Sequence, residues 1–385
     1  MKHKINKFLS RSTTLEALLT ACMSTFLVTL LLTFLWVLAL TGSWSNFVNT
    51  VKFSQVLAIT DRVYIGEADA DSVADAGFSA MIAALGDRWS YYMTAEEFER
   101  YQQVQSNTYT GVGVTLRQTE AGYAILAVAA DSPADRAGVT AGTYLVAVNG
   151  VRLTEETTSE ISAMMHADPN NICIIVADAT GAETEYTLAM EVIYSNPVSY
   201  EMKKNNVGYI KIENFDEHCA EEAIAAVDAL MEQGAEALVF DVRGNGGGYV
   251  TELCKLLDYL LPEGELFVSV DENGKEKVTY SDKHCVDLPM AVLVDENSYS
   301  AAEFFAAALR EYDAAVLVGA KTTGKNRSQT NVLLVDGGAV HISSRRYLTP
   351  NRVDLTEQGG LIPDIEVAAG EGDPQLAAAL GIFNG

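Results

Sequence analysis

The sequence of 385 residues predicts an α/β domain preceded by a compact α+β module, a small helical segment and one transmembrane helix. Three observations lead to this prediction. Residues 17–40 are almost wholly apolar, residues 108–190 place short strands and two helices in one module, and from residue 192 apolar strands alternate with helices. A chain of this length can bury the cores of two or three domains.

The apolar run, ALLTACMSTFLVTLLLTFLWVLAL, contains no charged residue. As a helix it would measure roughly 36 Å, enough to cross a hydrocarbon core of about 30 Å. Four basic residues precede it and none follows until Lys52. The positive-inside bias therefore predicts a cytoplasmic tail over residues 1–16 and a transmembrane signal-anchor over residues 17–41.

The remainder of the chain is accordingly expected on the extracytoplasmic side of a bacterial cell membrane, as part of a single-pass protein. A cleaved signal peptide is the alternative interpretation. Its apolar region would normally be about 7 to 15 residues long and would end in a small-x-small site, which favours the uncleaved anchor here.

Charge and cysteine usage exclude two classes of function. The net charge of -26 argues against a nucleic-acid partner, because phosphate contacts need Lys and Arg. The cysteines outside the apolar run show no C-x-x-C spacing and the histidines are scattered, so no metal site is predicted. Buried free thiols are favoured over a disulfide, although an extracytoplasmic location would permit one.

Residues 42–106 are predicted to form a helical N-terminal segment, with helical spacing in ADSVADAGFSAMIAALGD and TAEEFERYQQVQ and the turn GDRWSYYM between them. A segment this small cannot hold much core alone. We expect it to pack on a neighbour or on a second copy of itself, which would make the protein a homo-oligomer.

The pattern of residues 107–190 predicts the α+β module. Two strands are followed by a short helix that begins near Pro133, by a hairpin with Asn149-Gly150 at its tip, by the helix TTSEISAMMHA and by two further strands.

This module resembles a PDZ domain. TGVGV resembles the family's carboxylate-binding loop, and SPADRAGVTAGTYLVAVNG resembles the stretch that follows it, with Ala141-Gly142-Thr143 where Pro-Gly-Asp is usual. The resemblance implies that the loop of Gly111, Val112, Gly113 and Val114 captures a peptide's terminal carboxylate while the peptide adds a strand to the sheet. A G-x-G alone is equally compatible with a simple turn, so the order of elements carries the binding interpretation.

Residues 191–369 alternate strands with helices, which indicates an α/β core with largely parallel pairing, and then become β-rich. Residues 370–385 are treated as a C-terminal tail. Within the core, DENSYSAAEFF passes from an apolar strand through hydroxyl side chains into a helix. Ser300 stands at the start of that helix, where the N–H of Ala301 would be a natural oxyanion donor. The glycine-rich turn DVRGNGGG offers a second backbone donor.

A serine nucleophile needs a base. No histidine lies in a suitable turn, whereas GAKTTGKNRSQT offers Lys321 and Lys325 just past a strand. Burial can lower a lysine pKa from about 10.4 toward 7 to 8, which is the range a general base requires. Gln329, four residues beyond Lys325, falls on the same side of the chain and could orient the amine.

Several stretches together resemble the signatures of the carboxyl-terminal processing peptidases, tail-specific serine proteases with a Ser-Lys dyad. They are ENSYSAAE, TTGKNRSQ, DVRGNGGG, RRYLTP and GGLIPDIEV, and GDRWSYYM resembles the family's motif ahead of its PDZ domain. The resemblance covers about residues 60–368. It implies that the α/β protease core is ClpP/crotonase-like and that neither a metal nor a cofactor is required.

Carried over by position, the resemblance implies Ser300 as nucleophile, Lys325 as general base, Gln329 as its orienting partner, and Gly247 and Ala301 as oxyanion donors. Ser298 and Lys321 are the alternative serine and lysine. Gly246 stands where the family usually has proline, Asn326 where it has glycine, and Tyr299-Ser300-Ala301-Ala302 where an Ala/Ser-rich run is usual. The replacement of the usual proline by Gly246 weakens the assignment of Gly247 as an oxyanion donor.

The resulting hypothesis is a membrane-anchored serine endopeptidase that recognises protein or peptide C-termini through its PDZ domain and cleaves them through an acyl-enzyme. One alternative is a catalytically inert, membrane-tethered PDZ protein that only binds peptides. A nucleotide hydrolase is a second alternative, because VGAKTTGKN is one residue short of a phosphate-binding loop. Asn326 lacks the hydroxyl that would hold magnesium, and the residues after it read as a strand, which disfavours this alternative.

Overall fold

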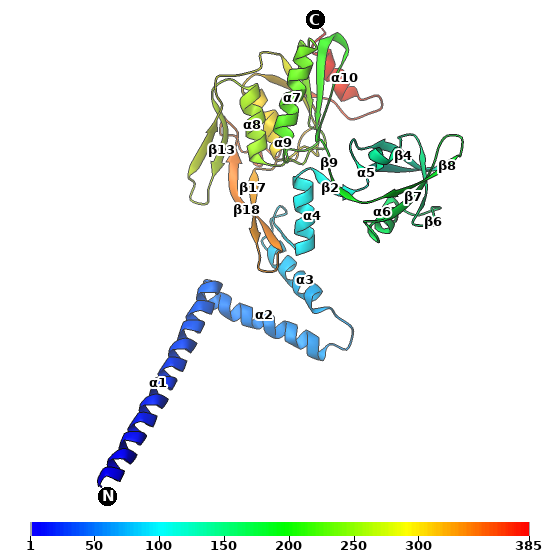
Figure 1. The fold of residues 1–385 in the computed structure, drawn as a ribbon. Coiled ribbons are helices and arrows are strands. Elements are labelled where there is room, and N and C mark those ends of the chain that lie inside the picture. The colour runs from blue at the N-terminus through cyan, green and yellow to red at the C-terminus, as the bar shows by residue number, and fades with distance from the viewer. Residues whose placement is uncertain (1, 385) are drawn as a thin grey trace. The chain divides into compact units, whose positions relative to one another are not determined.

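The computed structural model describes residues 2–384, so Met1 and Gly385, the end residues of the two predicted tails, lie outside the described residues. The chain divides after Leu85 into two compact units. The first unit contains three helices, which are α1 (Lys2–Thr41), α2 (Trp44–Val63) and α3 (Ala70–Ala83) (Figure 1).

Helix α1 contains the predicted span. Its residues Glu16–Ala39 have a mean hydropathy of 2.2 and none of that stretch is buried, so by length and composition they could cross a membrane. The side of the membrane on which the rest of the chain lies stays a prediction.

Helices α2 and α3 form a hairpin in which the rings of Phe53 and Phe78 stack with centroids 5.1 Å apart. Ser43 caps α2 by accepting a hydrogen bond from the N–H of Asn46, and Asp69 caps α3 in the same way. Neither of these two helices contains a buried residue. A segment without its own core is what the sequence predicted for this region.

The predicted helical segment of residues 42–106 is nevertheless divided between the two units. Residues from Gly86 onward belong to the second unit, where β1 (Tyr91–Met93) and α4 (Ala95–Gln105) are found. The reason is that β1 pairs antiparallel with a strand of the core, and Phe98 of α4 packs beneath it. The aromatic stretch after GDRW is therefore a strand of the core, which local spacing alone could not indicate.

The α+β module forms one antiparallel sheet with its own buried core. Its elements are β3 (Val114–Thr119), β4 (Gly122–Val128), α5 (Pro133–Ala137), β5 (Tyr144–Val148), β6 (Val151–Arg152), α6 (Thr158–His166), β7 (Ile172–Ala177) and β8 (Glu183–Leu188). The sheet order is β3-β4-β5-β7-β8, with β6 paired to β5, so β3 lies at an edge. The positive φ angles of Asn149 and Gly150 form the predicted hairpin turn.

A two-stranded ribbon joins this module to the core. Strand β2 (Thr108–Gly111) leads into the module, β9 (Glu191–Tyr194) leads out, and the two pair antiparallel. Just before β2, the side chain of Asn107 donates to the carbonyl of Glu217 at 2.8 Å, which fixes the ribbon to the core.

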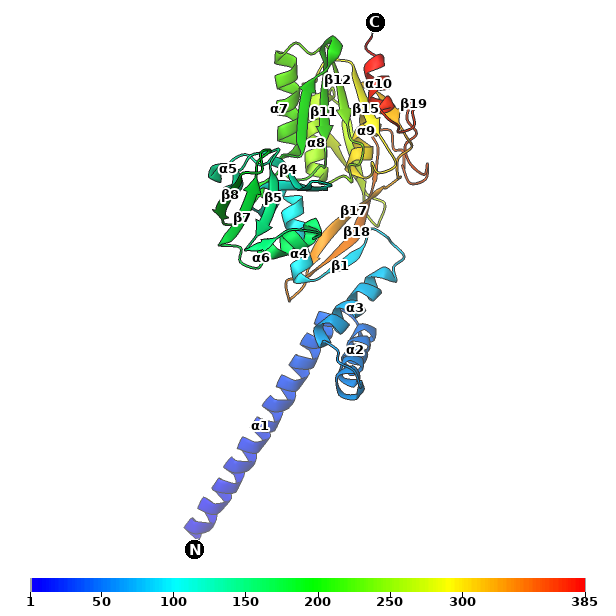
Figure 2. The ribbon, with the colours of Figure 1, turned by 90° about the vertical axis from the view of Figure 1, so that its right-hand side faces the viewer.

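The core contains a six-stranded sheet of order β10-β11-β12-β15-β16-β19, parallel except for the β10–β11 pair. Figure 2 shows β11, β12 and β15 running side by side. The strands are β10 (Val198–Met202), β11 (Val207–Ile212), β12 (Ala237–Asp241), β15 (Met290–Val294), β16 (Ala315–Gly319) and β19 (Ile365–Glu366). The helices are α7 (Cys219–Glu232), α8 (Val250–Leu260), α9 (Ala301–Glu311) and α10 (Pro374–Gly381).

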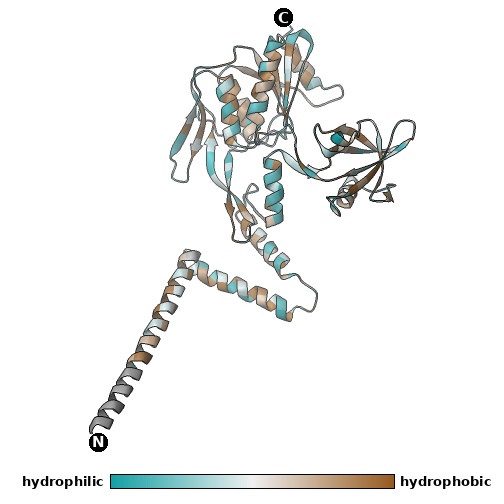
Figure 3. Cartoon of the chain, in the orientation of Figure 1, coloured by the Kyte–Doolittle hydropathy of each residue, from teal (hydrophilic) through white to brown (hydrophobic). Residues whose placement is uncertain are grey.

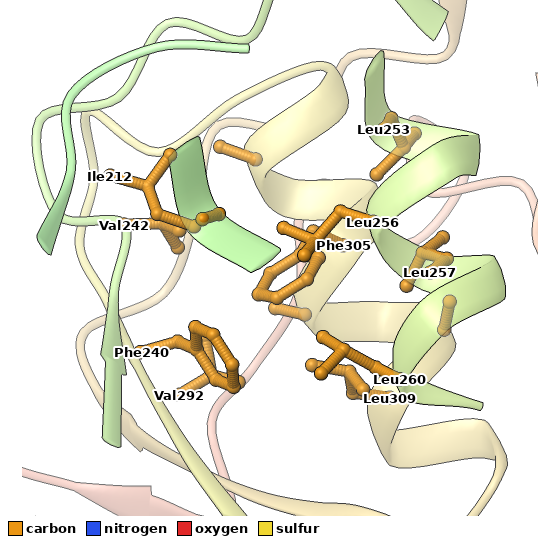
Figure 4. Packing of buried hydrophobic residues seen from close by; sticks show 14 of the residues in the cluster. Ile212, Phe240, Val242, Leu253, Leu256, Leu257, Leu260, Val292, Phe305 and Leu309 are labelled. Carbon is orange, nitrogen blue, oxygen red and sulfur yellow. The ribbon is translucent and has the colours of Figure 1, made fainter. Parts of the chain in front are cut away.

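Alternate residues of the central strands enter two different cores. Phe240 and Val292 face α8 and α9, where the ring of Phe305 lies 5.4 Å from that of Phe240 and near the leucines of α8 (Figure 4). Val239 and Leu293 face the opposite side, where they cluster with α10. Parallel strands that are covered on both faces need continuous apolar runs, as ALVFD and MAVLV provide.

Helices α7 and α8 are amphipathic, and Figure 3 shows hydrophilic and hydrophobic residues interleaved along them, whereas α9 is buried from Ala301 to Leu309. Of the four cysteines predicted to be buried free thiols, Cys219 of α7 and Cys254 of α8 are buried, whereas Cys173 is half-buried and Cys285 is exposed.

A second, antiparallel sheet has the order β1-β18-β13-β14, with β17 also paired to β18. Its strands beyond β1 are β13 (Glu265–Val270), β14 (Glu276–Tyr280), β17 (Arg327–Leu333) and β18 (Ala339–Leu348). The sequence predicted the β17 and β18 strands but not β13 or β14.

The description of residues 370–385 as a tail is wrong for most of that stretch. It contains α10, whose Ala379 is fully buried against the sheet. Asp373 caps the helix and also accepts two hydrogen bonds, at 2.7 and 2.9 Å, from the guanidinium of Arg243. The helix forms here because the second face of a parallel sheet has to be covered.

We predict that Arg243→Met lowers the free energy of unfolding by about 3 kcal/mol, because it leaves the carboxylate of Asp241, which is 2% exposed, without its bidentate partner. Chemical denaturation monitored by circular dichroism would measure the loss. The matched control is Arg152→Met, which removes an exposed pair with Glu183 and should cost less than about 1 kcal/mol. Equal effects of the two substitutions would contradict the prediction.

Candidate active site

Ser300 occupies a strained backbone position between β15 and α9. Its φ of 59° and ψ of -125° belong to a region that favours glycine, and Ala301 begins the helix directly after it. Such a sharp turn from strand to helix presents the serine side chain at the helix N-terminus. The N–H of Ala301 belongs to the first turn, where backbone donors have no acceptor inside the helix.

Ser298, the alternative serine, has a structural role. It is fully buried, its hydroxyl donates to the carbonyl of Val242 at 2.8 Å, and it accepts from the N–H of Asp295 at 3.0 Å. These bonds hold the turn that carries Ser300. Because its proton is already committed, Ser298 is poorly suited to be a nucleophile.

The glycine-rich turn packs against Ser300, but the N–H of Gly247 is not available as the predicted oxyanion donor. A Cβ built on Gly247 would lie 2.7 Å from the Cβ of Ser300 and 2.9 Å from the nitrogen of Ala301, so only glycine fits there. The N–H of Gly247, however, donates to Oδ1 of Asn245 at 2.8 Å. In this structure the N–H of Gly247 is therefore not a free oxyanion donor, because it is already hydrogen-bonded to the side chain of Asn245.

Gly246 lies against the side chain of Tyr299. A Cβ at position 246 would lie 2.7 Å from the hydroxyl oxygen of Tyr299. With the Tyr299 ring where it lies, a side chain at position 246 would displace it, so the two departures from the family pattern fit one another sterically.

Lys325 lies on the loop between β16 and β17 and is 9% exposed. Its Nζ is 4.5 Å from the ring centroid of Trp89 and 5.9 Å from that of Tyr299. Burial lowers the pKa of Lys325 to about 8, while the charge of Asp87 acts to raise this pKa and that of Arg88 to lower it. An amine with such a pKa is partly neutral near neutral pH and can accept a proton.

Glu303 holds the Lys325 loop against the serine helix. This fully buried carboxylate of α9 accepts hydrogen bonds from the backbone N–H groups of Gly324 at 2.8 Å and Lys325 at 3.0 Å, and from the hydroxyl of Thr322. Burial raises the pKa of Glu303 against the lowering effect of these bonds. The exposed Lys321, the alternative lysine, lies outside this arrangement.

Tyr347 holds the Lys325 loop and lines the same cleft as Ser300. Its hydroxyl donates to the carbonyl of Lys325 at 2.7 Å. Burial raises the pKa of this tyrosine, so it remains neutral. Within residues 2–384, no direct hydrogen bond links the Ser300 hydroxyl to the Lys325 amine.

Most of the predicted site residues line one cleft of about 640 Å³. Ser300, Ala301, Lys325 and Gln329 line it, while Gly247 lies behind the serine. The amide of Gln329 donates to the Ser343 hydroxyl at 3.0 Å and to a backbone carbonyl at 3.1 Å. It does not reach the Lys325 amine by a hydrogen bond in the described structure, so its orienting role stays a prediction.

Sequence reasoning missed three residues around Lys325, which are Trp89, Glu303 and Tyr347. Each lies inside a motif that the sequence singled out, namely GDRWSYYM, ENSYSAAE and RRYLTP. The motifs therefore marked the right stretches. What they could not show was that all three stretches converge on one lysine.

The predicted carboxylate loop lies in the α+β module. The carbonyls of Val112 and Gly113 accept from the N–H groups of Ala134 and Ala129, at 2.9 and 2.8 Å, which holds the loop against α5. Gly113 has a φ of 91°, and Val114 begins the edge strand β3. An incoming peptide could add to this free edge.

Comparison with known proteins agrees with this organisation. Residues 206–367 match peptidase family S41 and residues 125–177 match the PDZ domain. The carboxyl-terminal-processing peptidase 1 of Arabidopsis thaliana chloroplasts is 30% identical over 74% of this chain and 60% of its own length. The carboxy-terminal processing protease CtpA of Bacillus subtilis is 28% identical over 83% of this chain and 70% of its own length.

A solved structure from Bacteroides fragilis, whose name assigns it to the S41 proteases, is also similar. It is 17% identical with a TM-score of 0.55, and the match covers 83% of this chain and 92% of that chain. At this identity the match bears on the fold alone.

We predict opposite stability effects for the two serines. Ser300→Gly should raise the free energy of unfolding by about 1 kcal/mol, because glycine adopts a positive φ without strain. Ser298→Ala should lower it by about 2 kcal/mol, because it leaves the N–H of Asp295 without its acceptor and removes one of the two hydrogen bonds to the carbonyl of Val242. Urea denaturation would measure both, and a loss of stability in Ser300→Gly would contradict the assignment of strain.

Proposed function

Because the chain belongs to peptidase family S41, we propose that it is a membrane-anchored serine endopeptidase that acts on protein C-termini. The observation that carries this proposal is the buried Lys325, whose pKa is lowered to about 8, in one cleft with Ser300 at the start of α9. A solvated lysine would be fully protonated at neutral pH and could not serve as a base. The chain spans 60% of the length of its Arabidopsis relative, so activity and substrate are inferred for this chain on its own residues.

The proposed reaction begins when the neutral Lys325 amine takes the proton of the Ser300 hydroxyl and Oγ attacks the scissile carbonyl carbon. Negative charge then develops on the carbonyl oxygen, where the N–H of Ala301 and the positive end of α9 stabilise it. The Lys325 ammonium gives its proton to the departing amine, leaving an ester on Ser300. Water, deprotonated by the same lysine, hydrolyses that ester.

The attack requires a side-chain adjustment, because among residues 2–384 no hydrogen bond joins the Ser300 hydroxyl to the Lys325 amine, and that amine lies over the ring of Trp89. A rotamer change of either side chain could bring the two together. For the N–H of Gly247 to act as the second oxyanion donor, its hydrogen bond to the side chain of Asn245 would have to break. Gln329 could approach the amine after leaving its hydrogen bond with Ser343.

We assign substrate recognition to residues 107–190. The loop of Gly111, Val112, Gly113 and Val114 would receive the terminal carboxylate, and the free edge of β3 would pair with the residues before it. The protease core would comprise residues 191–369, as a ClpP/crotonase-like unit, together with α10. Anchoring through α1 and an extracytoplasmic location complete the proposal.

The first prediction of this proposal concerns the dyad. Ser300→Ala and Lys325→Ala should each reduce peptide cleavage by at least about 100-fold, because they remove the nucleophile and the base. The full chain in detergent micelles and a fluorogenic peptide with a free C-terminus would measure cleavage, with the exposed Lys321→Ala as matched control. Wild-type rates in both cleft variants would eliminate the dyad. Peptide binding without any cleavage by the wild type would indicate the inert PDZ protein.

A second prediction concerns the terminal carboxylate. A peptide that ends in a free carboxylate should be cleaved with a KM at least about tenfold lower than its amidated form, because amidation removes charge-assisted hydrogen bonds. Gly113→Ala should abolish this difference, since its Cβ would lie 2.2 Å from the Ser132 side chain. Gly122→Ala is the control, because Gly122, the first residue of β4, also has a positive φ, of 119°, but nothing lies within 4 Å of the position of its Cβ. Equal KM values in the wild type would rule out carboxylate capture.

A further inference from the structure

The turn that begins at Asp87 lies against the cleft, and none of the steps above uses it. The Asp87 carboxylate accepts hydrogen bonds from the Ser90 hydroxyl at 2.7 Å and from the N–H of Trp89 at 3.2 Å. The Ser90 hydroxyl in turn accepts from the N–H of Ser343 on β18 at 3.0 Å. This turn is therefore fixed to the sheet that forms one wall of the cleft.

The indole of Trp89 covers the amine of Lys325. Its ring centroid lies 4.5 Å from the lysine Nζ and 5.3 Å from the ring centroid of Tyr299, and the guanidinium carbon of Arg88 lies 4.1 Å from it. Lys325 is only 9% exposed although its side chain ends in a group that water normally solvates. The two aromatic rings replace water around that group.

We propose that Trp89 is a positioning residue, which excludes water from the Lys325 amine and thereby keeps this base in its neutral, proton-accepting form. The inference rests on the proposed function, because Lys325 is the base of the proposed dyad. Trp89 itself touches neither the reacting serine nor the substrate carbonyl in the proposed reaction.

The ring acts on the amine in two opposing ways. Its π face attracts the ammonium form, which favours protonation. Its bulk removes water, which disfavours protonation. Lys325 is only 9% exposed and burial lowers its pKa, so we take water exclusion to be the larger of the two effects of the ring.

The charged groups near the amine do not decide its protonation. Asp87 and Arg88 act in opposite directions, and Asp87 is also 3.7 Å from the guanidinium of Arg327. Among the described residues no carboxylate forms an ion pair with the lysine Nζ within 4.0 Å. The Glu303 carboxylate binds the backbone N–H of Lys325, on the side of α9.

Three further titratable neighbours, His341, Tyr347 and Tyr91, are neutral near pH 7. Burial, followed by the charge of Lys325, lowers the pKa of His341 on β18 to about 4. Burial raises the pKa of Tyr347 and raises that of Tyr91 to about 12. Tyr299 lies beside the amine as an aromatic ring. Exclusion of water by the rings is therefore the main control on the charge of Lys325.

The test compares two substitutions of Trp89 in the full chain in detergent micelles. Trp89→Ala admits water beside the amine, so the acidic limb of the pH profile of kcat/KM should move up by about one pH unit. Cleavage would then fall about tenfold at pH 7 and recover at higher pH. Trp89→Leu retains bulk without a π face, so its limb should lie at or below that of the wild type. A loss in Trp89→Ala that is equal at every pH, or a limb that moves down, would overturn the proposal.

A second readout does not depend on cleavage. In the Ser300→Ala background, fluorodinitrobenzene labels a lysine only when its amine is neutral, and mass spectrometry gives the pH midpoint of labelling at each lysine. The midpoint at Lys325 should rise in Trp89→Ala, while that at the exposed Lys321 should not change. Tyr249→Ala is the matched control, since Tyr249 lines the same cleft but is not one of the rings beside Lys325.

The two readouts separate the two proposals. An unshifted labelling midpoint in Trp89→Ala, with normal cleavage by the wild type, would refute the role of Trp89 and leave the peptidase intact. A shifted midpoint in a wild-type protein that cleaves no peptide would refute the peptidase and retain the effect of Trp89 on the amine.

Discussion

An amine buried without a counter-ion is the constraint on which the cleft depends. Lys325 is 9% exposed and faces two aromatic rings, a costly position for a group that is normally charged. The structure holds it there by its backbone. Glu303 binds its N–H and Tyr347 binds its carbonyl, so the loop cannot swing the side chain into water without breaking two buried hydrogen bonds. The same two residues belong to the serine helix and to β18, so the position of the lysine follows from the packing of those elements.

The serine side of the cleft stores strain in a comparable way. Ser300 adopts a backbone conformation that favours glycine, and the turn before it is tied down by the buried hydroxyl of Ser298. The glycine turn packs so closely that Gly247 contacts the serine and Gly246 accommodates the Tyr299 hydroxyl. Strain at one residue persists because its neighbours leave no alternative space.

The sequence predicted those features that depend on local order along the chain. Alternating strands and helices gave the α/β core, and Asn149-Gly150 gave the hairpin of the PDZ domain. The positions of Ser300 and Lys325 in one cleft followed from motifs of known spacing. The errors concern contacts between distant segments. Helix α10 depends on a sheet face formed far earlier in the chain, and the division of residues 42–106 depends on β1 pairing with β18.

The same distinction applies to the site itself. Sequence can propose which backbone groups are donors, but it could not show that the Asn245 side chain takes the N–H of Gly247. Nor could it show that Trp89, more than 200 residues before Lys325, covers that amine.

One stretch of chain joins the PDZ domain to the cleft. Tyr101 and Gln105 of α4 line the cleft, and α4 ends just before Asn107 and the ribbon strand β2. Gln105 also donates to the buried Asp216 at 2.6 Å, and Tyr101 donates to Gln105 at 3.1 Å. Strand β2 continues directly into the predicted carboxylate loop, so β2 and the turn at Asn107 separate that loop from α4. Helix α4 is thus both part of the wall of the cleft and the element from which the ribbon to the PDZ domain starts, so one hydrogen-bonded segment belongs to both.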